Sequence, residues 1–364
     1  MKAIVWHGRG DVRFEDMPTA SVPKQGEVRV RVGFCGICGT DWEEFRSGPI
    51  FIPVESPHPL THMQAPVILG HEFSGVVDSV GPGVETLTVG DHVAAETLFY
   101  CGKCANCRRH LFNLCQFSGA LGLAAHGGLS ALVTAPAELF LTAPERVPLD
   151  ELALAEPLAV AVRAVRHLDP GEGDRTLVMG AGPVGLLVMQ VLRTKGTLVD
   201  VVEPQPSRVQ LAAQLGAGQV FTPLSFSETT TADYDGAVDC TGVPEAQLTA
   251  LNALRSQGRL VLVGVSTVLT PINTMDILQT ERQVVGSLSH VIDTDFAAAL
   301  DLLTRQEIRV RPLISTCLSL RQAAALFQNG TNPLPLDVVK ILVDPNILDD
   351  EEGVPGPGEA TLRC

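Results

Sequence analysis

Two cysteines in "GFCGICGTD", residues 33–41, are the first candidates for chemistry. Cys35 and Cys38 lie two residues apart on the turn that follows a predicted strand. This spacing is typical of a redox pair, of half a zinc knuckle, or of one metal ligand beside a cysteine without a role. His71 and Glu72 in "ILGHEFSG" are candidate partners. A thiolate, an imidazole and a carboxylate or water together form the open zinc shell of a catalytic site.

Glu156 in "LAEPLAV" is a further candidate, because it precedes Pro157 at the predicted start of a helix. Each candidate also has a structural interpretation. His71 could be a hydrogen-bonded histidine of the interior, and Glu72 could be a surface charge. Glu156 could be a residue of the first helical turn that the helix dipole stabilises. The residues taken singly leave these alternatives open.

A second group of cysteines lies on one short loop, "CGKCANCRRHLFNLC". Its members, separated by gaps of two, two and seven residues, are Cys101, Cys104, Cys107 and Cys115. Four thiolates close a tetrahedral shell, which predicts a structural zinc. An iron–sulfur cluster fits less well, because Gln116 rather than proline follows the last cysteine. A DNA-reading finger is disfavoured by the net charge of -15 and by the lack of a basic recognition helix.

The glycine cluster "VMGAGPVG", residues 178–185, follows a predicted strand and opens a helix. Such glycines allow a tight turn and a close backbone approach to a pyrophosphate at the helix N-terminus. Glu203 ends the next predicted strand, where its carboxylate can accept ribose hydroxyls and would repel a 2'-phosphate, so NAD is preferred over NADP. Alternatively, the glycine cluster is a turn that binds no ligand, and Glu203 is a solvated residue at the end of a strand. The predicted cofactor-binding residues are Gly180, Gly182, Pro183, Val184, Gly185, Glu203 and Arg208.

The elements that must position these residues change character along the chain. The first 150 or so residues contain short strands and turns, as in "GEVRVRVGF", where valines alternate with arginines. From about residue 158, buried strands alternate with helices, which predicts an α/β domain with a doubly wound parallel sheet. We therefore expect one domain over 158–292 and another made of 1–157 and 293–345. The acidic tail 346–364, rich in proline and glycine, is predicted to be disordered.

Length and composition limit the class of protein. With 364 residues, 45% of them hydrophobic, the chain is expected to form two domains of a soluble protein. The charge of -15 argues against nucleic acid and anionic membranes as partners. The chain shows no secretory signal and no stretch that suits a membrane span. Nine cysteines, an odd number, favour metal sites or free thiols in a reducing cytoplasm.

Several of these motifs together resemble the zinc-dependent medium-chain alcohol and polyol dehydrogenases. "GICGTD", "GHEFSG", the four-cysteine loop, "EPLAVAVRAV" and "GAGPVG" occur in that family's order and spacing. The resemblance implies a mainly β, GroES-like catalytic domain, a Rossmann domain, NAD, and two zinc ions per chain, one catalytic and one structural. It makes Cys38 and His71 catalytic zinc ligands, and Thr40 the hydroxyl that relays the alcohol proton. Glu72 and Glu156 become carboxylates that bind the zinc directly or through water.

By the same resemblance Cys35 matches no functional position, which leaves Cys38 as the ligand of the pair. A homodimer or homotetramer is also expected.

The long insert between the ligands, residues 47–72, bears on the substrate. It resembles the same stretch in the branch of the family that acts on (R,R)-2,3-butanediol, down to "GPIFIPV" and "HPLT". This implies oxidation of a secondary alcohol in a small vicinal diol to a hydroxyketone such as acetoin, and the reverse. His126, in an otherwise small-residue run, departs from that branch. The alternatives are a sorbitol-type polyol or threonine dehydrogenase, a non-catalytic dinucleotide-binding protein, and an insert that only covers the domain edge or an oligomer contact.

Overall fold

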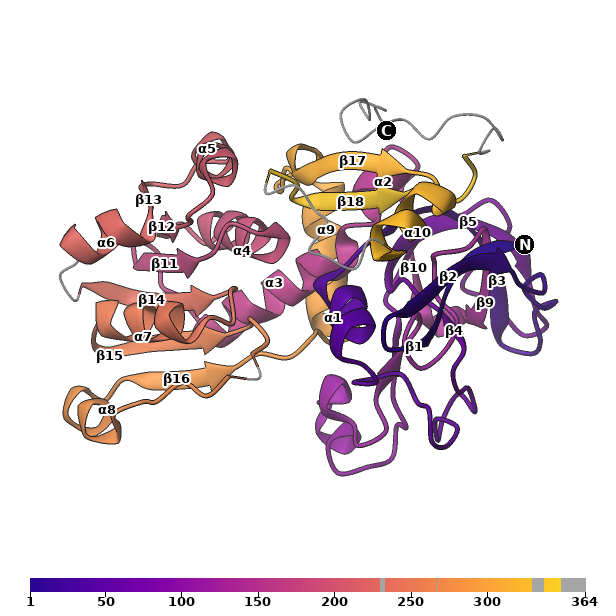
Figure 1. Ribbon diagram of the computed structural model, residues 1–364, viewed down its shortest axis with the longest axis horizontal. Helices are drawn as coiled ribbons and strands as arrows, with labels where there is room; N and C mark the ends of the chain where they lie inside the picture. Colours follow the sequence, from indigo (N-terminus) through magenta and orange to yellow (C-terminus); the bar gives the residue numbers. More distant parts are fainter. Residues whose placement is uncertain (230–232, 267, 329–336, 348–364) are drawn as a thin grey trace. The chain divides into compact units, whose positions relative to one another are not determined.

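The computed structural model describes residues 1–229, 233–266, 268–328 and 337–347. Contacts divide the chain into two compact units, coloured along the sequence in Figure 1. Unit 1 comprises Met1–Glu156 and Ile314–Cys364, and unit 2 comprises Pro157–Leu313. The expected division differs at residue 157 and at residues 293–313, which group with unit 2 rather than with the first domain.

Buried polar contacts explain why residues 293–313 join unit 2. Asp295 is fully buried and accepts hydrogen bonds from Arg163 at 3.1 Å and from Arg166 at 2.8 Å. Gln190 bonds both the backbone N–H and the carbonyl of Arg309. We therefore propose 157–313 as the nucleotide-binding domain.

In the described part of unit 1, seven strands form one sheet in the order β10-β6-β5-β3-β18-β17, with β9 also paired to β3. Smaller sheets are β2-β1-β4 and β7-β8. The elements of unit 1 are β1 (Lys2–Gly8), β2 (Asp11–Asp16), β3 (Glu27–Gly36), α1 (Gly39–Ser47), β4 (Val67–Ile68), β5 (Glu72–Val80), β6 (His92–Ala95), β7 (Leu98–Phe99), β8 (Gly119–Ala120), β9 (Leu132–Pro136), β10 (Phe140–Ala143), α2 (Leu149–Leu152), β17 (Ile314–Leu318), α10 (Leu320–Gln328) and β18 (Lys340–Val343).

Strand β3 is central to this sheet and carries the predicted alternation. Val28, Val30 and Val32 are buried, and the intervening arginines are more exposed. Its far end pairs with two strands at once. Glu72 of β5 lies opposite Gly36, and Leu342 of β18 also lies opposite Gly36. The pairing thus brings three distant parts of the chain together just before Cys38.

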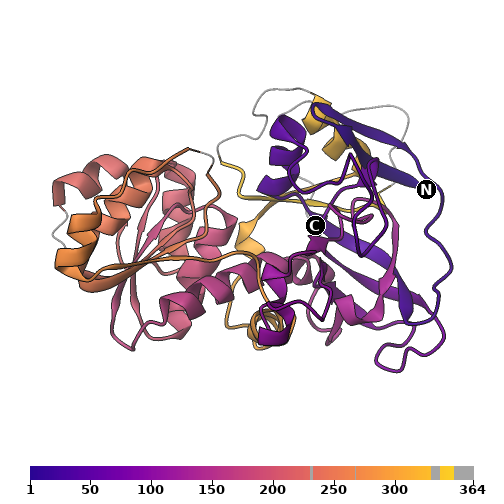
Figure 2. The ribbon, with the colours of Figure 1, turned by 90° about the horizontal axis from the view of Figure 1, so that it is seen from below.

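Unit 2 is an α/β unit built on a parallel sheet, as predicted. Its described strands follow the order β13-β12-β11-β14-β15-β16, and helices cover both faces of the sheet (Figure 2). The elements of unit 2 are α3 (Ala155–Leu168), which begins at the boundary, β11 (Arg175–Met179), α4 (Pro183–Thr194), β12 (Leu198–Val202), α5 (Pro206–Gln214), β13 (Val220–Phe221), α6 (Pro223–Thr229), β14 (Tyr234–Asp239), α7 (Pro244–Ala253), β15 (Leu254–Leu262), α8 (Thr274–Thr280), β16 (Gln283–Gly286) and α9 (Ala297–Thr304).

The strand order of unit 2 reverses at β11, which lies between β12 and β14. In open parallel sheets, ligands bind outside the carboxyl ends of the strands at such a switch point. The glycine cluster at 180–185 follows β11 directly. The fold therefore presents this cluster where a dinucleotide is expected.

Two further expectations concern whole segments. No helix in the described residues is long and apolar enough to cross a membrane. Of the tail expected to be disordered, 348–364 lie outside the described residues. Asn346, however, donates a hydrogen bond of 2.9 Å to the carbonyl of Val32, so the described chain stays packed against β3 up to that point.

Candidate active site and metal centres

The candidate catalytic metal centre lies where β3, β5 and α1 meet. Ligand atoms of Cys38, His71 and Glu72 all lie within 4.8 Å of one another. Cys38 is the N-cap residue of α1, and Glu72 begins β5 opposite Gly36. A side chain at Gly36 would collide with the Glu72 carboxylate. A glycine at this position therefore allows the carboxylate to approach the thiol.

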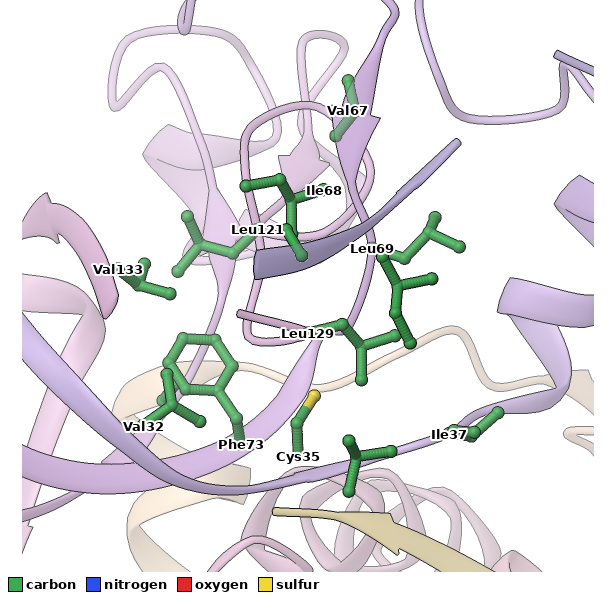
Figure 3. Close-up of a cluster of buried hydrophobic side chains, with 14 of the residues drawn as sticks. Val32, Cys35, Ile37, Val67, Ile68, Leu69, Phe73, Leu121, Leu129 and Val133 are labelled. Carbon is green, nitrogen blue, oxygen red and sulfur yellow. The ribbon is translucent and has the colours of Figure 1, made fainter. Parts of the chain in front are cut away.

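Cys35 points away from this group into the hydrophobic core. It is fully buried, and Figure 3 shows it in a cluster with Leu129 and Phe73. Burial, followed by the charges of Asp41 and Glu72, raises the pKa of the Cys35 thiol well above its normal value. A neutral buried thiol is a poor metal ligand and a poor nucleophile. This placement agrees with the interpretation of Cys35 as the cysteine of the pair that has no functional role.

Asp41 completes the surroundings of the ligands. Its Oδ2 accepts a hydrogen bond of 2.9 Å from the backbone N–H of Cys38, and its Oδ1 lies 3.6 Å from His71 Nδ1. Burial lowers the pKa of His71, but the charges of Cys38 and Asp41 outweigh burial, so the net pKa is well above normal. The surroundings of His71 are therefore negatively charged, and a zinc ion bound there would compensate that charge.

Lys340 of β18 contacts the same group from another direction. Its Nζ lies 2.5 Å from Glu72 Oε2 and 3.2 Å from the carbonyl of Ile37. Both side chains of this ion pair are 3% exposed. Burial lowers the pKa of Lys340, whereas Glu72 and then Cys38 raise it, and the net shift is upward. The ammonium group therefore neutralises part of the negative charge of the centre.

The structure places the remaining predicted catalytic residues around this group. Thr40 lies in the first turn of α1, with its Oγ1 3.8 Å from Cys38 Sγ. Glu156 is half-buried and does not belong to the group of ligand atoms within 4.8 Å, although its charge contributes to the raised pKa of Lys340. Among the described residues, the structure thus brings Glu72 rather than Glu156 into direct ligand range.

The four-cysteine loop fits a tetrahedral metal ion. Tetrahedral zinc with sulfur at about 2.3 Å places the sulfur atoms about 3.8 Å apart. The Sγ atom of Cys104 lies 3.5 Å from that of Cys107 and 4.0 Å from that of Cys115, and the Sγ atoms of Cys101 and Cys107 lie 3.9 Å apart. Disulfides require about 2.05 Å, so these cysteines are unpaired thiols.

Electrostatics in this loop also favour a cation. Backbone hydrogen bonds, chiefly from Cys107, lower the pKa of Cys104 to about 6, so a thiolate forms readily at neutral pH. Burial raises the pKa of Cys107 to about 12. A bound cation is therefore needed for all four sulfur atoms to ionise together.

The nucleotide loop has the geometry that the glycines predict. Gly180 adopts a φ of +92°, and a side chain at Gly185 would collide with the Gly180 carbonyl. Gly182 is the N-cap of α4, which begins with Pro183. Proline has no N–H, so the N–H groups of Val184 and Gly185 are the ones that the first turn can offer to a phosphate.

Glu203 closes the nucleotide loop from the next strand. It is buried, and its carboxylate accepts hydrogen bonds from Ala181 N at 2.7 Å and Gln205 N at 2.9 Å. A carboxylate has about four acceptor positions, so capacity remains for a ribose hydroxyl. Arg208 lies half-buried in the first turn of α5, after Glu203.

Sequence reasoning missed Asp41 and Lys340. Asp41 follows Cys38 by three residues, the spacing at which an N3 carboxylate reaches back to a helix N-cap, so a local signal was present. Lys340 interrupts the otherwise apolar strand "VVKILV", and a buried lysine needs a partner. Nothing local indicated that this partner is Glu72, 268 residues away.

Comparisons with known proteins agree with this architecture. Residues 24–145 match the family model of the alcohol dehydrogenase GroES-like domain, and 183–305 match that of the zinc-binding dehydrogenases. The (R,R)-butanediol dehydrogenase of Bacillus subtilis (strain 168) is 37% identical, over 95% of this chain and 100% of the relative. D-xylulose reductase A of Aspergillus oryzae is 31% identical, over 89% of this chain and 92% of the relative.

Solved structures show the same similarity. The 2R,3R-butanediol dehydrogenase of Bacillus subtilis superimposes with a TM-score of 0.86 at 36% identity, covering 95% of this chain and 99% of that one. A putative zinc-binding dehydrogenase from Sinorhizobium meliloti 1021, bound to NADP, superimposes with a TM-score of 0.87 at 27% identity. An alcohol dehydrogenase from Escherichia coli CFT073, complexed with NADH, gives 0.82 at 28% identity. Both of the latter superpositions cover 94% of this chain and 99% of the chain compared with it.

Fold, site and relatives together define a class. The chain belongs to the zinc-dependent medium-chain alcohol and polyol dehydrogenases, with a GroES-like domain and a Rossmann domain. It is a zinc-binding alcohol dehydrogenase that uses a nicotinamide cofactor.

Proposed function

We propose that this enzyme oxidises one secondary alcohol of (R,R)-2,3-butanediol or a similar vicinal diol to a hydroxyketone such as acetoin with NAD, and catalyses the reverse reduction. The observation that carries the proposal is the compact Cys38, His71 and Glu72 ligand set. The similarity to butanediol dehydrogenases supports the choice of substrate.

Cys38, His71 and Glu72 would hold the catalytic zinc, and Glu156 would act near it through water. Bound zinc acts as a Lewis acid that can lower the pKa of a bound water from about 15.7 to about 7, and a comparable shift is expected for an alcohol. Asp41 orients His71, and Thr40 accepts the alcohol proton and passes it outward. NAD, when bound, would supply the hydride acceptor for the oxidised carbon.

The cofactor and metal content are the finer parts of the proposal. NAD is preferred because the Glu203 carboxylate can accept a ribose hydroxyl and repels a 2'-phosphate. Two zinc ions per chain are expected because the two ligand sets share no residue. Cys101, Cys104, Cys107 and Cys115 leave no open position, so their zinc is structural.

The apolar insert supports a short substrate, with one revision. The apolar run Phe51, Ile52 and Pro53 of the insert would suit a methyl-flanked diol, but the structure separates its side chains. Ile52 is only 2% exposed and packs in the core, whereas Phe51 is 54% exposed and Ile50 is 48% exposed. Ile50 and Phe51 are thus the side chains available to contact a ligand.

A homodimer or homotetramer is the proposed assembly. Strand β16 is the edge of its sheet, and α8 has no buried residue, with Met275 and Leu278 exposed. An exposed sheet edge beside apolar side chains suits pairing with a second copy. The described four-cysteine loop and Cys35 form no disulfide, which suits a reducing compartment such as the cytoplasm.

Initial rates with a panel of diols, polyols and threonine, each with NAD and NADP, test the proposal. A polyhydroxy sugar would leave hydroxyls against carbon, and each such mismatch costs about 1–3 kcal/mol. Two mismatches near the middle of this range, about 4 kcal/mol together, predict a kcat/KM for butanediol about a hundredfold or more above that for sorbitol. Comparable values for sorbitol or threonine would favour those dehydrogenase branches. Cofactor binding without turnover would favour a non-catalytic protein.

A further inference from the structure

Asp239, the last residue of β14, is a buried carboxylate that binds the loop following it. It is 0% exposed. Its Oδ1 accepts hydrogen bonds from the backbone N–H of Thr241 at 3.0 Å and from the Thr241 hydroxyl at 2.6 Å. Its Oδ2 accepts hydrogen bonds from Gly242 N at 3.1 Å and from Gln247 Nε2 at 3.0 Å. A carboxylate has about four acceptor positions, so these four donors occupy all of them.

Backbone hydrogen bonds place this loop directly beside the nucleotide loop. Cys240 N donates to the carbonyl of Met179 at 3.0 Å, and Gly180 N donates to the carbonyl of Val202 at 2.8 Å. The carboxyl ends of β12, β11 and β14 therefore lie side by side in the sheet (Figure 1). A side chain at Gly180 would approach Thr241 Cγ2 to 2.8 Å. The loop after β14 thus lies against the glycine cluster.

The loop after β15 packs against the loop after β14. Val263 N and Gly264 N donate to the backbone of Asp239, whose carbonyl accepts them at 2.9 Å and 3.0 Å. A side chain at Gly264 would collide with Gly242 N, and a side chain at Gly242 would collide with the Val265 carbonyl. Glycine at both positions allows the two loops to pack backbone against backbone. Asp239 therefore holds one loop through its carboxylate and the other through its carbonyl.

The order of the strands indicates what lies on these loops when the cofactor is bound. Along the sheet the order is β12-β11-β14-β15. Glu203 after β12 suits the adenosine ribose, and the N-terminus of α4 after β11 suits the pyrophosphate. Neighbouring strands lie about 4.8 Å apart, so the loops after β14 and β15 lie about 5 and 10 Å beyond β11, on the side away from Glu203. A dinucleotide that continues in this direction places its nicotinamide half there.

We propose that Asp239 is a positioning residue for the nicotinamide half of the cofactor, because it fixes residues 240–243 and 263–265 as the surface on which that half lies. The carboxylate is fully buried and its acceptor positions are occupied, so it acts through the two loops and does not touch the cofactor. The inference goes beyond the proposed function. It depends neither on the alcohol that is oxidised nor on the choice between NAD and NADP.

Asp239→Asn tests this role, because the amide replaces one acceptor oxygen by a donor. Whichever way the amide is turned, the backbone N–H of Thr241 or of Gly242 then faces another donor. We expect the dissociation constant of NADH, measured by fluorescence titration, to rise about tenfold or more, which corresponds to about 1.4 kcal/mol. ADP carries only the adenosine half and the pyrophosphate. Its dissociation constant, measured by calorimetry, should stay at the wild-type value.

Asp200→Asn is the matched control, since Asp200 is a buried carboxylate of the same sheet. It is 8% exposed and accepts hydrogen bonds of 2.8 Å from Gln219 N and from the Tyr234 hydroxyl. Tyr234 begins β14, so this contact lies toward the amino ends of the strands, away from the two loops. Asp200→Asn should lower the unfolding temperature but leave the ratio of the NADH and ADP dissociation constants unchanged.

Two results for Asp239→Asn would overturn the inference. If the dissociation constants of NADH and ADP rise by the same factor, Asp239 supports the whole nucleotide site and not its nicotinamide half. If the unfolding temperature falls while both constants stay unchanged, its role is only structural. In a wild type that prefers NADP, NADPH and ADP with a 2'-phosphate give the same comparison.

A second variant covers the case in which Asp239→Asn does not fold. Asp239→Glu keeps the charge and lengthens the side chain by one methylene, which displaces the carboxylate from the N–H groups it binds. The dissociation constant of NADH should then rise while that of ADP stays at the wild-type value. Unchanged NADH binding in Asp239→Glu would refute the positioning role.

Discussion

Replacing Lys340 by Met should destabilise unit 1 strongly, because it leaves the buried Glu72 carboxylate without its ammonium partner. The pair is 3% exposed on both sides, and its Nζ–Oε2 distance is 2.5 Å. Removing one partner of such a buried pair costs about 3–5 kcal/mol, which corresponds to two to nearly four powers of ten in the unfolding equilibrium. Lys2 forms a similar contact with Asp16 at 2.7 Å, but those side chains are 52% and 74% exposed. Lys2→Met is the matched control, and we expect no measurable change from it.

Urea unfolding of zinc-loaded and chelator-treated protein measures the effect. The cost of Lys340→Met should be larger after chelation, because a bound cation also compensates Glu72. Adding Glu72→Gln to Lys340→Met should restore part of the stability, since the unpaired charge is then absent. The folded-state pKa of Lys340 is raised, so its contribution is complete below the unfolded pKa of about 10.4 and lost only above the folded value. The cost should therefore stay constant between about pH 6 and 9. If Lys340→Met lowers the free energy of unfolding no more than Lys2→Met does, the reasoning is refuted.

Three other predictions concern the metal and cofactor sites. Cys107→Ser should remove one of two zinc ions and lower the unfolding temperature while the other zinc remains, and elemental analysis that finds one zinc or none in the fully active wild type would contradict it. Cys38→Ser should remove the catalytic zinc and nearly all turnover, whereas Cys35→Ser should keep zinc and activity per folded molecule. If both variants fold but lose activity, Cys35 has a functional role and the assignment is wrong. Glu203→Ser should narrow the preference for NAD over NADP. It should also raise the KM for both cofactors, because the carboxylate accepts a hydrogen bond from the N–H of Ala181. Steady-state kinetics with both cofactors measure these changes, and a wild-type enzyme that prefers NADP would contradict the prediction.

The sequence predicted those parts of the site whose residues are close together in the chain. The four cysteines at 101–115 and the loop at 180–185 each lie on one short segment, so spacing alone indicates which atoms meet. The class of fold was equally accessible, because alternating strands and helices after residue 158 leave few arrangements other than a parallel sheet. Cys38 and His71 could be paired only through the family resemblance.

The parts that escaped prediction depend on distant pairing. Lys340 reaches Glu72 because β18 pairs with β3, and the apolar pattern of "VVKILV" does not identify its neighbour. Residues 293–313 belong to unit 2 because Asp295 binds arginines 129 and 132 residues earlier, a contact without local signature. Ile52 lies in the core although the neighbouring Phe51 does not, and the backbone N–H groups of both residues donate to the buried Glu44 carboxylate, a contact that the apolar pattern does not indicate.

The same pairing fixes the arrangement of the candidate metal centre, whose ligands come from two separate motifs. Glu72 faces Gly36 across one strand pair, and Leu342 faces Gly36 across another, so the register of two antiparallel pairs sets the distance from Glu72 to both Cys38 and Lys340. A slip of one residue in either pair would turn the side chain to the opposite face of the sheet. The core valines of β3 oppose such a slip, because it would also expose them. Burial of those valines therefore stabilises the ligand geometry, and a core substitution such as Val32→Ala should loosen zinc binding although residue 32 touches no ligand.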